Sequence, residues 1–179
     1  MSAQPVVIVE YDPTWPVDFE ALKGAYEAAL HGLIESVEHV GSTAVPGLAA
    51  KPIIDVDLVI ADRALLPEVI QRLAALGYRH EGDLGVAGRE AFARDGDPHT
   101  PRDGSGRVWP AHHLYVCASD CAALHEHLRF RDYLRAHPEK AREYGELKQH
   151  LAAAFREDRA AYGEAKTAFV RSILQLCST

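Results

Sequence analysis

Cysteine is scarce in this sequence, and its apolar residues form no long run. The chain has 179 residues and three cysteines, Cys117, Cys121 and Cys177. An odd, sparse set does not build a disulfide framework and is typical of a reducing compartment. No apolar stretch approaches the roughly 20 residues that a membrane-spanning helix needs, and the first residues lack the charged and apolar regions of a signal peptide. We therefore expect a cytoplasmic protein with no membrane partner.

Positive charge is also in deficit. The chain carries 19 Lys and Arg against 26 Asp and Glu, a net charge of −7 with neutral histidines. Proteins that bind nucleic acid or membranes over a broad surface are generally basic, so nucleic acid is not an expected partner, although a local basic patch is compatible with this balance. The apolar fraction of 47% is that of a globular protein.

The only pattern of soft metal ligands combines Cys117 and Cys121 with His125 and His127. Structural zinc sites usually draw on two ligand pairs of tetrahedral geometry, and here the cysteine pair straddles an expected strand end and helix start, with no second cysteine pair. Buried thiols and surface histidines are the preferred interpretation.

Hydrophobic spacing predicts strands that alternate with helices, followed by a helical tail. The expected strands cover 5–11, 36–40, 53–60, 78–81, 86–94 and 113–117, and the expected helices cover about 15–33, 65–76, 120–136, 138–156 and 158–176. This order predicts an α/β (α+β) fold with a mixed sheet flanked by helices and a C-terminal helical bundle. We expect a single domain over 1–179, with the sheet core in 1–118 and the helical part in 119–179.

The stretch 95–110 is rich in Gly, Pro, Asp and Arg and offers little that could pack. We expect a long mobile loop there. Loops of this length often serve as lids or binding loops, and a disordered surface insertion is the equally acceptable alternative.

Two aspartates stand in the clearest strand of the chain. Asp55 and Asp57 are two positions apart, so they point to one face, while the apolar residues between and after them point to the other. Neighbouring carboxylates that lose hydration repel each other unless one is protonated or a cation lies between them. Mg²⁺ resolves this repulsion and keeps positions for phosphate and water. An exposed sheet edge without a role explains Asp-x-Asp equally well.

A Gly-Ser turn before this strand favours the metal interpretation. Gly41 permits close approach of the backbone, and Ser42 offers its N–H and hydroxyl to an anion. A tight turn with a capping serine would explain either residue alone. The turn and the aspartate pair together are less common by chance, and they indicate a site for a metal-bound polyphosphate.

Two lysines fall among apolar residues on their helices. The apolar arc around Lys148 consists of Tyr144, Leu147, Leu151 and Phe155, and the arc around Lys166 consists of Tyr162, Phe169, Val170 and Ile173. A lysine on a packed face must snorkel to water or meet an anion. Snorkelling is the simpler interpretation, and phosphate binding, above all by Lys166, is the alternative.

Three further cations lie near the expected site. Lys51 precedes the aspartate strand, and Arg89 lies in a neighbouring predicted strand. Arg131 can pair with surface carboxylates on its own helix or bind a phosphate or carboxylate of a substrate with two hydrogen bonds.

The Gly-Ser turn, the loop and the acidic strand resemble the core motif of the polymerase-β-like nucleotidyltransferase superfamily. Longer segments resemble one family within it, the GrpB family, in the expected order and over nearly the whole chain. These segments are 11–16, 39–55, 112–116, 128–138 and 162–169. The resemblance implies a nucleotidyltransferase-like fold in a bacterial cytoplasmic protein.

The resemblance also implies roles for single residues. Asp55 and Asp57 would hold Mg²⁺ (or Mn²⁺), and Gly41 and Ser42 would contact the nucleoside triphosphate. We extend the expected nucleotide site to further residues, namely Thr43, Lys51, Arg131 and Lys166.

The third carboxylate of the superfamily motif has no obvious counterpart. The strand over 113–117 offers His113 and Tyr115 on its polar face, and GrpB-like sequences often have histidine at the position of Tyr115. His113 could be a metal ligand, a general base or a phosphate contact, or a structural hydrogen-bonding residue. Glu90 is a weaker substitute for the missing acid.

These features predict a Mg²⁺-dependent nucleotidyltransferase that moves a nucleoside monophosphate from a triphosphate to an unidentified small acceptor. Its catalytic residues would be Asp55, Asp57 and His113. Because the third acid that activates an attacking hydroxyl is missing, a non-catalytic module that binds a nucleotide or a CoA precursor is the alternative. A hydrolase or phosphotransferase that uses the His113 side is a third interpretation. Acceptor, base preference and oligomeric state do not follow from the sequence.

Overall fold

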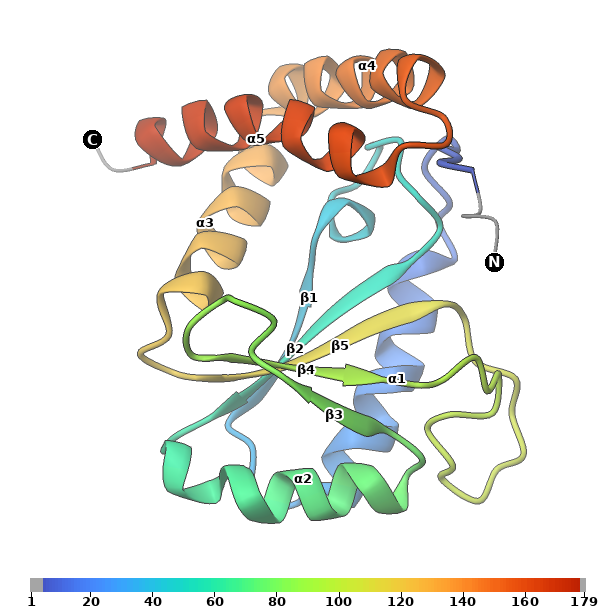
Figure 1. Cartoon of the computed structure of the whole chain (residues 1–179), viewed down its shortest axis with the longest axis vertical. Helices are drawn as coiled ribbons and strands as arrows, with labels where there is room; N and C mark the ends of the chain where they lie inside the picture. The colour runs from blue at the N-terminus through green and yellow to red at the C-terminus, as the bar shows by residue number, and fades with distance from the viewer. Residues whose placement is uncertain (1–4, 178–179) are drawn as a thin grey trace.

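A computed structural model of the chain describes residues 5–177, apart from the side chain of Arg159. Its centre is a five-stranded sheet with the strand order β1-β2-β5-β4-β3 (Figure 1). The strands are β1 (Ser36–Val40), β2 (Ile54–Ile60), β3 (Arg79–Gly82), β4 (Arg89–Ala93) and β5 (His112–Ala118). The helices are α1 (Trp15–Ala29), α2 (Leu66–Ala75), α3 (Ala122–Ala136), α4 (Pro138–Ala154) and α5 (Arg159–Leu176).

The sheet is mixed, as the sequence predicts. β2 and β5 run parallel at its centre, and the other neighbours pair antiparallel. The register places Asp55 opposite His113 and Asp57 opposite Tyr115. Because paired residues present their side chains to the same face, these four side chains share one face of the two central strands.

The opposite face of the sheet carries the main hydrophobic core. Val56, Leu58, Leu114 and Val116 are buried there, so the predicted alternation of β2 and β5 is confirmed. Helix α1 covers this face, and α2 closes it at one end (Figure 1). The predicted apolar stripe of the first helix is also confirmed, and its buried residues are Trp15, Phe19, Leu22 and Tyr26.

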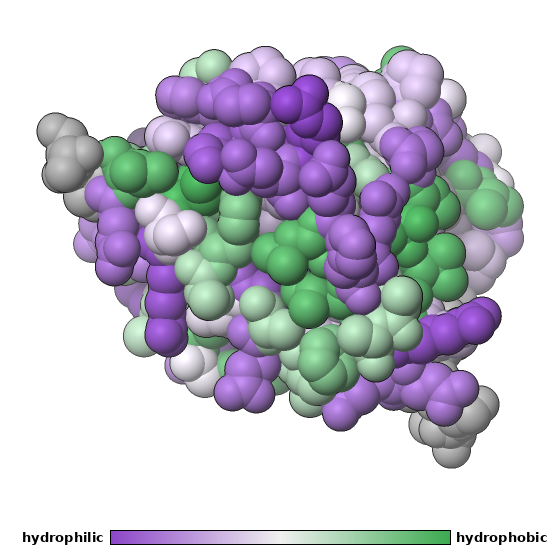
Figure 2. All heavy atoms as spheres, turned by 90° about the horizontal axis from the view of Figure 1, so that it is seen from above, coloured by the Kyte–Doolittle hydropathy of each residue, from purple (hydrophilic) through white to green (hydrophobic). Residues whose placement is uncertain are grey.

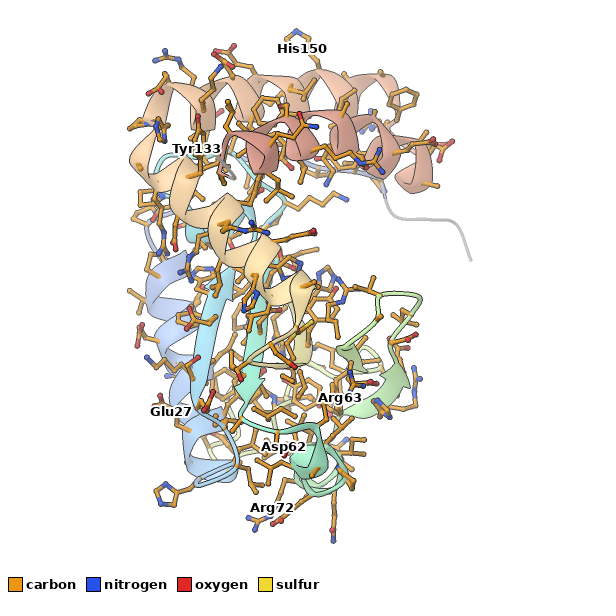
Figure 3. All side chains as sticks on the ribbon, turned by 90° about the vertical axis from the view of Figure 1, so that its left-hand side faces the viewer. Glu27, Asp62, Arg63, Arg72, Tyr133 and His150 are labelled. Carbon is orange, nitrogen blue, oxygen red and sulfur yellow. The ribbon has the colours of Figure 1, made fainter. Side chains whose placement is uncertain are left out.

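The three C-terminal helices lie on the aspartate side of the molecule. Helix α3 packs on β2 and β5, where Val59 and Cys117 meet Cys121 and Leu124. Figure 3 shows α3 running alongside the sheet to α4 and α5, with Tyr133 near their junction, and α4 and α5 lie across one end of the sheet (Figure 1). None of the helices in residues 5–177 has the length and apolarity that a bilayer crossing requires.

The strand predicted over 5–11 is wrong. The segment forms a single antiparallel bridge, between Val9 and Ala50. Near the start of the segment, Val6 donates its N–H to the carbonyl of Arg156 at 2.8 Å and packs against Ala152 and Tyr162. Val6 therefore docks on the C-terminal helices, whereas Val7 and Val9 are exposed.

The expectation that 95–110 packs little is also wrong. Trp109 is 5% exposed and belongs to the main core, and its Nε1 donates to the Pro101 carbonyl at 2.8 Å. The backbone N–H of Arg102 donates to the Leu76 carbonyl at 2.8 Å, and its guanidinium pairs with Asp97 at 2.9 Å. The loop is thus tied to the core by a buried tryptophan and to the end of α2 by its backbone.

Candidate active site

Each aspartate of β2 accepts a hydrogen bond from a histidine of another element. The Nδ1 of His113, from β5, lies 2.8 Å from Oδ1 of Asp55. The Nδ1 of His127, from α3, lies 2.7 Å from Oδ2 of Asp57. Asp57 is 0% exposed, and its other oxygen, Oδ1, is buried without a hydrogen-bond partner. The two carboxylates therefore share a face, as predicted, and one of them keeps an unsatisfied oxygen.

The Gly-Ser turn lies directly beside Asp55. Gly41 has φ of +71°, and a Cβ at this position would overlap the space that Oδ2 of Asp55 occupies. Only glycine satisfies both conditions. Ser42 begins a short 3₁₀ turn, Ser42–Ala44, in which the buried Thr43 hydroxyl contacts Nε2 of His39 at 3.0 Å. The Thr43 hydroxyl therefore holds the loop, while Ser42 faces the site.

A cavity of about 250 Å³ opens between this turn and the C-terminal helices. Three lysines line it, and we call it the lysine cavity. Lys51 and Lys166 place their Nζ atoms 4.6 and 4.7 Å from the ring centre of Tyr162. Its lining residues are Ser42, Thr43, Ala50, Lys51, Ile53, Asp55, His113, Lys148, Tyr162 and Lys166.

Lys148 is the most confined of these cations. It is 2% exposed, its Nζ has no hydrogen-bond partner, and Nζ lies 4.6 Å from the ring centre of Tyr144. Burial, and then the charge of Lys166, lower the pKa of Lys148 to about 7, while Asp55 opposes this shift. Burial, and then Lys51, lower the pKa of Lys166 as well. An anion between these amines would relieve both effects.

The position of these lysines is unusual for their helices. Figure 2 looks down on α4 and α5 and shows hydrophilic side chains over much of this end of the molecule, with hydrophobic ones gathered among them. Charged side chains normally lie on that outer surface, as Lys140 of α4 does in its exposed pair with Glu143. Lys148 instead turns inward, as the periodicity of α4 predicts, and its Nζ does not reach water by snorkelling.

A second cavity, of about 170 Å³, lies on the other side of Asp55. We call it the arginine cavity, because the guanidinium of Arg89 lines it, 4.3 Å from the ring centre of Tyr115. The Nε of Arg89 is buried without a hydrogen-bond partner. The residues that line the arginine cavity are Val40, Gly41, Asp55, Arg89, Tyr115 and His127. Asp55 alone among them also lines the lysine cavity.

The pKa values of two residues that line the arginine cavity, His127 and Tyr115, are raised. Burial on its own would lower the pKa of His127, but the hydrogen bond and charge of Asp57 outweigh it, so the pKa is raised. Burial, and then the charge of Asp55, raise the pKa of Tyr115. At neutral pH Tyr115 therefore keeps its proton, and it cannot act as a fixed negative charge.

Unsatisfied polar atoms are concentrated at this site. In the part of the chain that the structure describes, three buried side-chain nitrogen or oxygen atoms lack a hydrogen-bond partner: Oδ1 of Asp57, Nε of Arg89 and Nζ of Lys148. Buried polar groups are rarely left unpaired in folded proteins. Lys148 lines the lysine cavity, Arg89 lines the arginine cavity, and Asp57 bonds His127, which lines the arginine cavity as well.

The register also shows which acids accompany the aspartate pair. Glu38 of β1 lies opposite Asp57, but its Oε2 accepts a hydrogen bond from Nη1 of Arg131 at 2.8 Å. Glu90 pairs with Val116, a core residue, so it lies on the opposite face and bonds His80 at 2.8 Å. Glu90 therefore cannot replace the third carboxylate, and Tyr115 occupies the place next to Asp57.

Most of the predicted site residues come together, and one lies apart. Arg131 also donates to the His39 carbonyl, at 3.1 Å, and does not line the lysine cavity, so in this structure it ties α3 to β1. Gly41 lines the arginine cavity, and the buried Asp57 lines neither cavity. The other predicted residues line the lysine cavity, and they are Ser42, Thr43, Lys51, Asp55, His113 and Lys166.

Sequence reasoning missed His127 as a site residue. It stands four positions before Arg131, so both lie on the face of α3 that meets the sheet, and this spacing was the available signal. Within residues 5–177, no cluster of three or more His, Cys, Asp or Glu side chains is suited to hold a metal. Cys117 and Cys121 are free and buried.

The mixed sheet and the placement of the Gly-Ser turn beside the Asp-x-Asp strand match a nucleotidyltransferase-like fold. The crystal structure of the Cid1 poly(U) polymerase superposes with a TM-score of 0.52 over 88% of this chain and 48% of that chain. The sequence identity is 13%, so the similarity is one of fold alone.

Within this fold, the chain belongs to the GrpB family. The model of the GrpB protein family matches residues 5–176. The crystal structure of the conserved protein GrpB from Enterococcus faecalis superposes with a TM-score of 0.80 and 31% identity over 96% of both chains.

Curated relatives support the same assignment. The UPF0157 protein PA4798 of Pseudomonas aeruginosa is 38% identical over 94% of this chain, and the UPF0157 protein YqkA of Bacillus subtilis is 32% identical over 93%. The match spans 66% of PA4798 and 46% of YqkA. The chain therefore corresponds to only part of these two relatives.

Proposed function

We propose that this protein transfers a nucleoside monophosphate from a nucleoside triphosphate to a small acceptor, with Mg²⁺ (or Mn²⁺) as the metal. The observation that carries this proposal is the set of three buried, unsatisfied atoms of Asp57, Arg89 and Lys148. One atom is a carboxylate oxygen that suits a cation, and two are cationic nitrogens that suit anions. A metal-bound nucleotide and an acceptor offer both kinds of partner.

The lysine cavity suits the polyphosphate. Lys51, Lys148 and Lys166 supply charges that compensate for the phosphate oxygens, and Ser42 adds a hydroxyl and an N–H at the turn. His113 lines this cavity with its Nδ1 bonded to Asp55, so its Nε2 is the nitrogen available for a phosphate. We assign His113 to contact with the reacting phosphate group.

Asp55 and Asp57 fit a divalent metal that is shared with the substrate. The buried, unpaired Oδ1 of Asp57 is a suitable ligand, and Mg²⁺ is commonly held by one or two carboxylates while phosphates and water complete its shell. When bound, the ion would offset negative charge that develops on the transferred phosphoryl group. The described residues offer no third ligand in a ready cluster, so we expect metal and nucleotide to bind together.

Two of the predicted nucleotide contacts act through the protein in this proposal. Thr43 holds the turn by its bond to His39, and Arg131 holds Glu38 and the end of β1. Both keep the Gly-Ser turn in position against Asp55. Direct contact of Arg131 with nucleotide would require it to leave Glu38.

Calorimetric titration of Mg-ATP and Mg-CTP tests the proposal. We expect at least tenfold weaker binding to the Asp55→Asn/Asp57→Asn double variant and to Lys166→Ala. Lys140→Ala, which removes an exposed lysine of α4, serves as the matched control and should bind like the wild type. Equal affinity of the wild type and the double variant would show that Asp55 and Asp57 do not bind the metal of the nucleotide.

A non-catalytic nucleotide-binding module is the second candidate. Its support is the position of Tyr115 opposite Asp57, where no carboxylate is available to activate a hydroxyl. Release of pyrophosphate separates the two candidates. Tight nucleotide binding without pyrophosphate release, over acceptors with hydroxyl, phosphate and carboxylate groups, would favour the module.

A further inference from the structure

The arginine cavity is not used by the nucleotide in the proposal above. It shares Asp55 with the lysine cavity and lies on the other side of that carboxylate. A transferred group next to Asp55 is therefore open to the lysine cavity on one side and to the arginine cavity on the other. This arrangement makes the arginine cavity the natural place for the acceptor.

Arg89 gives this cavity a preference for anions. Its guanidinium is stacked over the Tyr115 ring at 4.3 Å, which fixes the plane of its donors, and its Nε is buried without a partner. A planar guanidinium held in this way presents a fork that matches a carboxylate or phosphate. His127 faces the same cavity, and because Asp57 occupies its Nδ1, its Nε2 is the atom that can meet a ligand.

None of the acids around this cavity is left to act as a base, so His127 is the one remaining candidate among its lining residues. Asp55 and Asp57 are the proposed metal ligands, Glu38 is bound to Arg131, and Glu90 lies on the other face of the sheet. Tyr115 stands where a third acid would deprotonate an attacking hydroxyl. An acceptor whose attacking oxygen is already ionised requires no such group.

We infer that the acceptor attacks through an oxyanion, a phosphate monoester or a carboxylate, that Arg89 binds in the arginine cavity. The inference rests on the proposed function. In the transfer step, an oxygen lone pair of the acceptor forms a bond to the α-phosphorus of the nucleotide. The bond from this phosphorus to the oxygen that bridges to the β-phosphorus breaks, and pyrophosphate leaves with that electron pair.

This step takes no proton from the acceptor. A phosphate monoester would yield a product with a P–O–P linkage, and a carboxylate would yield an acyl phosphate anhydride. Since the second pKa of a phosphate monoester is about 6 and that of a carboxylic acid is about 4, both acceptors are ionised at pH 7. A hydroxyl acceptor, by contrast, would need a base, and His127, whose Nε2 faces the cavity, would have to supply it.

Binding to the nucleotide-loaded protein provides the test. The protein is first saturated with Mg²⁺ and the non-hydrolysable α,β-methylene analogue of ATP. Glycerol 3-phosphate, acetate and glycerol are then titrated separately and followed by calorimetry and NMR. We expect at least one of the two anions to bind at least tenfold more tightly than glycerol, and the anion that binds distinguishes a phosphate acceptor from a carboxylate acceptor.

Arg89 variants locate that binding. Arg89→Gln should lose at least tenfold in affinity for the anion, Arg89→Lys should lose less because it keeps the charge without the fork, and neither should change the affinity for the nucleotide analogue. Arg79→Gln removes an exposed arginine of β3 that pairs with Asp95, and it should behave like the wild type. Thermal unfolding and nucleotide binding confirm that each variant is folded.

The outcomes separate the inference from the proposed function. If the wild type does not bind the nucleotide analogue, the proposed function is wrong and the inference falls with it. If the analogue binds but glycerol binds as well as both anions, or Arg89→Gln keeps full anion affinity, the inference alone is wrong. With an acceptor that turns over, the product should carry a P–O–P or an acyl phosphate linkage, and a product joined through a hydroxyl oxygen of the acceptor would overturn the inference.

Discussion

Replacing Lys148 with methionine should stabilise the protein while weakening its binding of nucleotide. Methionine is unbranched, apolar and a good helix former, so it can occupy the buried space of the lysine in α4. It removes an ammonium that has no hydrogen-bond partner and that lies near the charge of Lys166. The variant therefore separates the stability of the fold from the function of the cavity.

The pKa of Lys148 sets the size of the effect. Its lowering from 10.5 to about 7 corresponds to about 5 kcal/mol for burying the charged form, at about 1.4 kcal/mol per tenfold change in proton affinity. Relaxation of the protein reduces this value, so we expect Lys148→Met to raise the free energy of unfolding by about 3 kcal/mol at pH 6. Lys140→Met, on the exposed side of the same helix, should change it by less than about 0.5 kcal/mol.

The dependence on pH has a definite sign. Because the folded protein holds the Lys148 proton less tightly than the unfolded chain, the unfolded chain binds more protons between pH 7 and 10.5. The free energy of unfolding of the wild type therefore rises with pH through that window, and the penalty is present in full below about pH 7. The advantage of Lys148→Met should thus shrink as the pH approaches 10.5.

Urea denaturation of the wild type and both variants at pH 6, 7, 8.5 and 10 measures these differences. Mg-ATP should raise the melting temperature of the wild type more than that of Lys148→Met, because a bound phosphate stabilises the buried charge. A stability difference between Lys148→Met and wild type that does not change with pH would refute the reasoning. So would an equal ligand-induced shift in both proteins.

Three further predictions concern other residues. In urea denaturation, Gly41→Ala should lower the free energy of unfolding by about 3 kcal/mol, and Gly47→Ala should lower it by about 1 kcal/mol. Both glycines have positive φ, but only a Cβ at position 41 would overlap Asp55. Equal losses in the two variants would contradict the close approach of Gly41 to Asp55. Arg131→Ala should lower the free energy of unfolding by about 2 kcal/mol, because Glu38 is left without its partner. It should weaken nucleotide binding less than Lys166→Ala does, and the reverse order in calorimetry would make Arg131 a direct nucleotide contact. Burial lowers the pKa of His39 and His112 to about 4. The unfolded chain therefore binds more protons between pH 4 and 6.5, so the free energy of unfolding falls as the pH falls through this window. An NMR titration that places the pKa of either ring near 6.5 would contradict this prediction.

The central part of the fold could be predicted because its signals are local. The alternation in β2 determines which residues face the core and that Asp55 and Asp57 share the other face. The helical periodicity of α4 likewise predicts the inward position of Lys148. In these cases the identity of the neighbours was not needed, since a period of 2 or 3.6 residues determines the direction of a side chain.

The predictions that failed depended on distant partners. The valines of 5–11 read as a strand, but whether a strand forms depends on a free sheet edge, and Val6 meets Ala152 and Tyr162 instead. In 95–110 the turn-forming residues concealed a buried anchor, Trp109. His127 follows the same principle, because nothing near it in sequence shows that its ring meets the carboxylate of Asp57 in another element.

The three unsatisfied atoms come from three elements, β2, β4 and α4, and this has a mechanical consequence. Ligands that satisfy all of them would connect the central strand β2, the strand β4 and the C-terminal helix α4. Filled cavities would then act as a non-covalent cross-link, and the sheet and helices would unfold as one unit. Empty cavities would let α4 and α5 open on their own, so hydrogen exchange in these helices should slow on ligand binding more than exchange in β2 and β5 does.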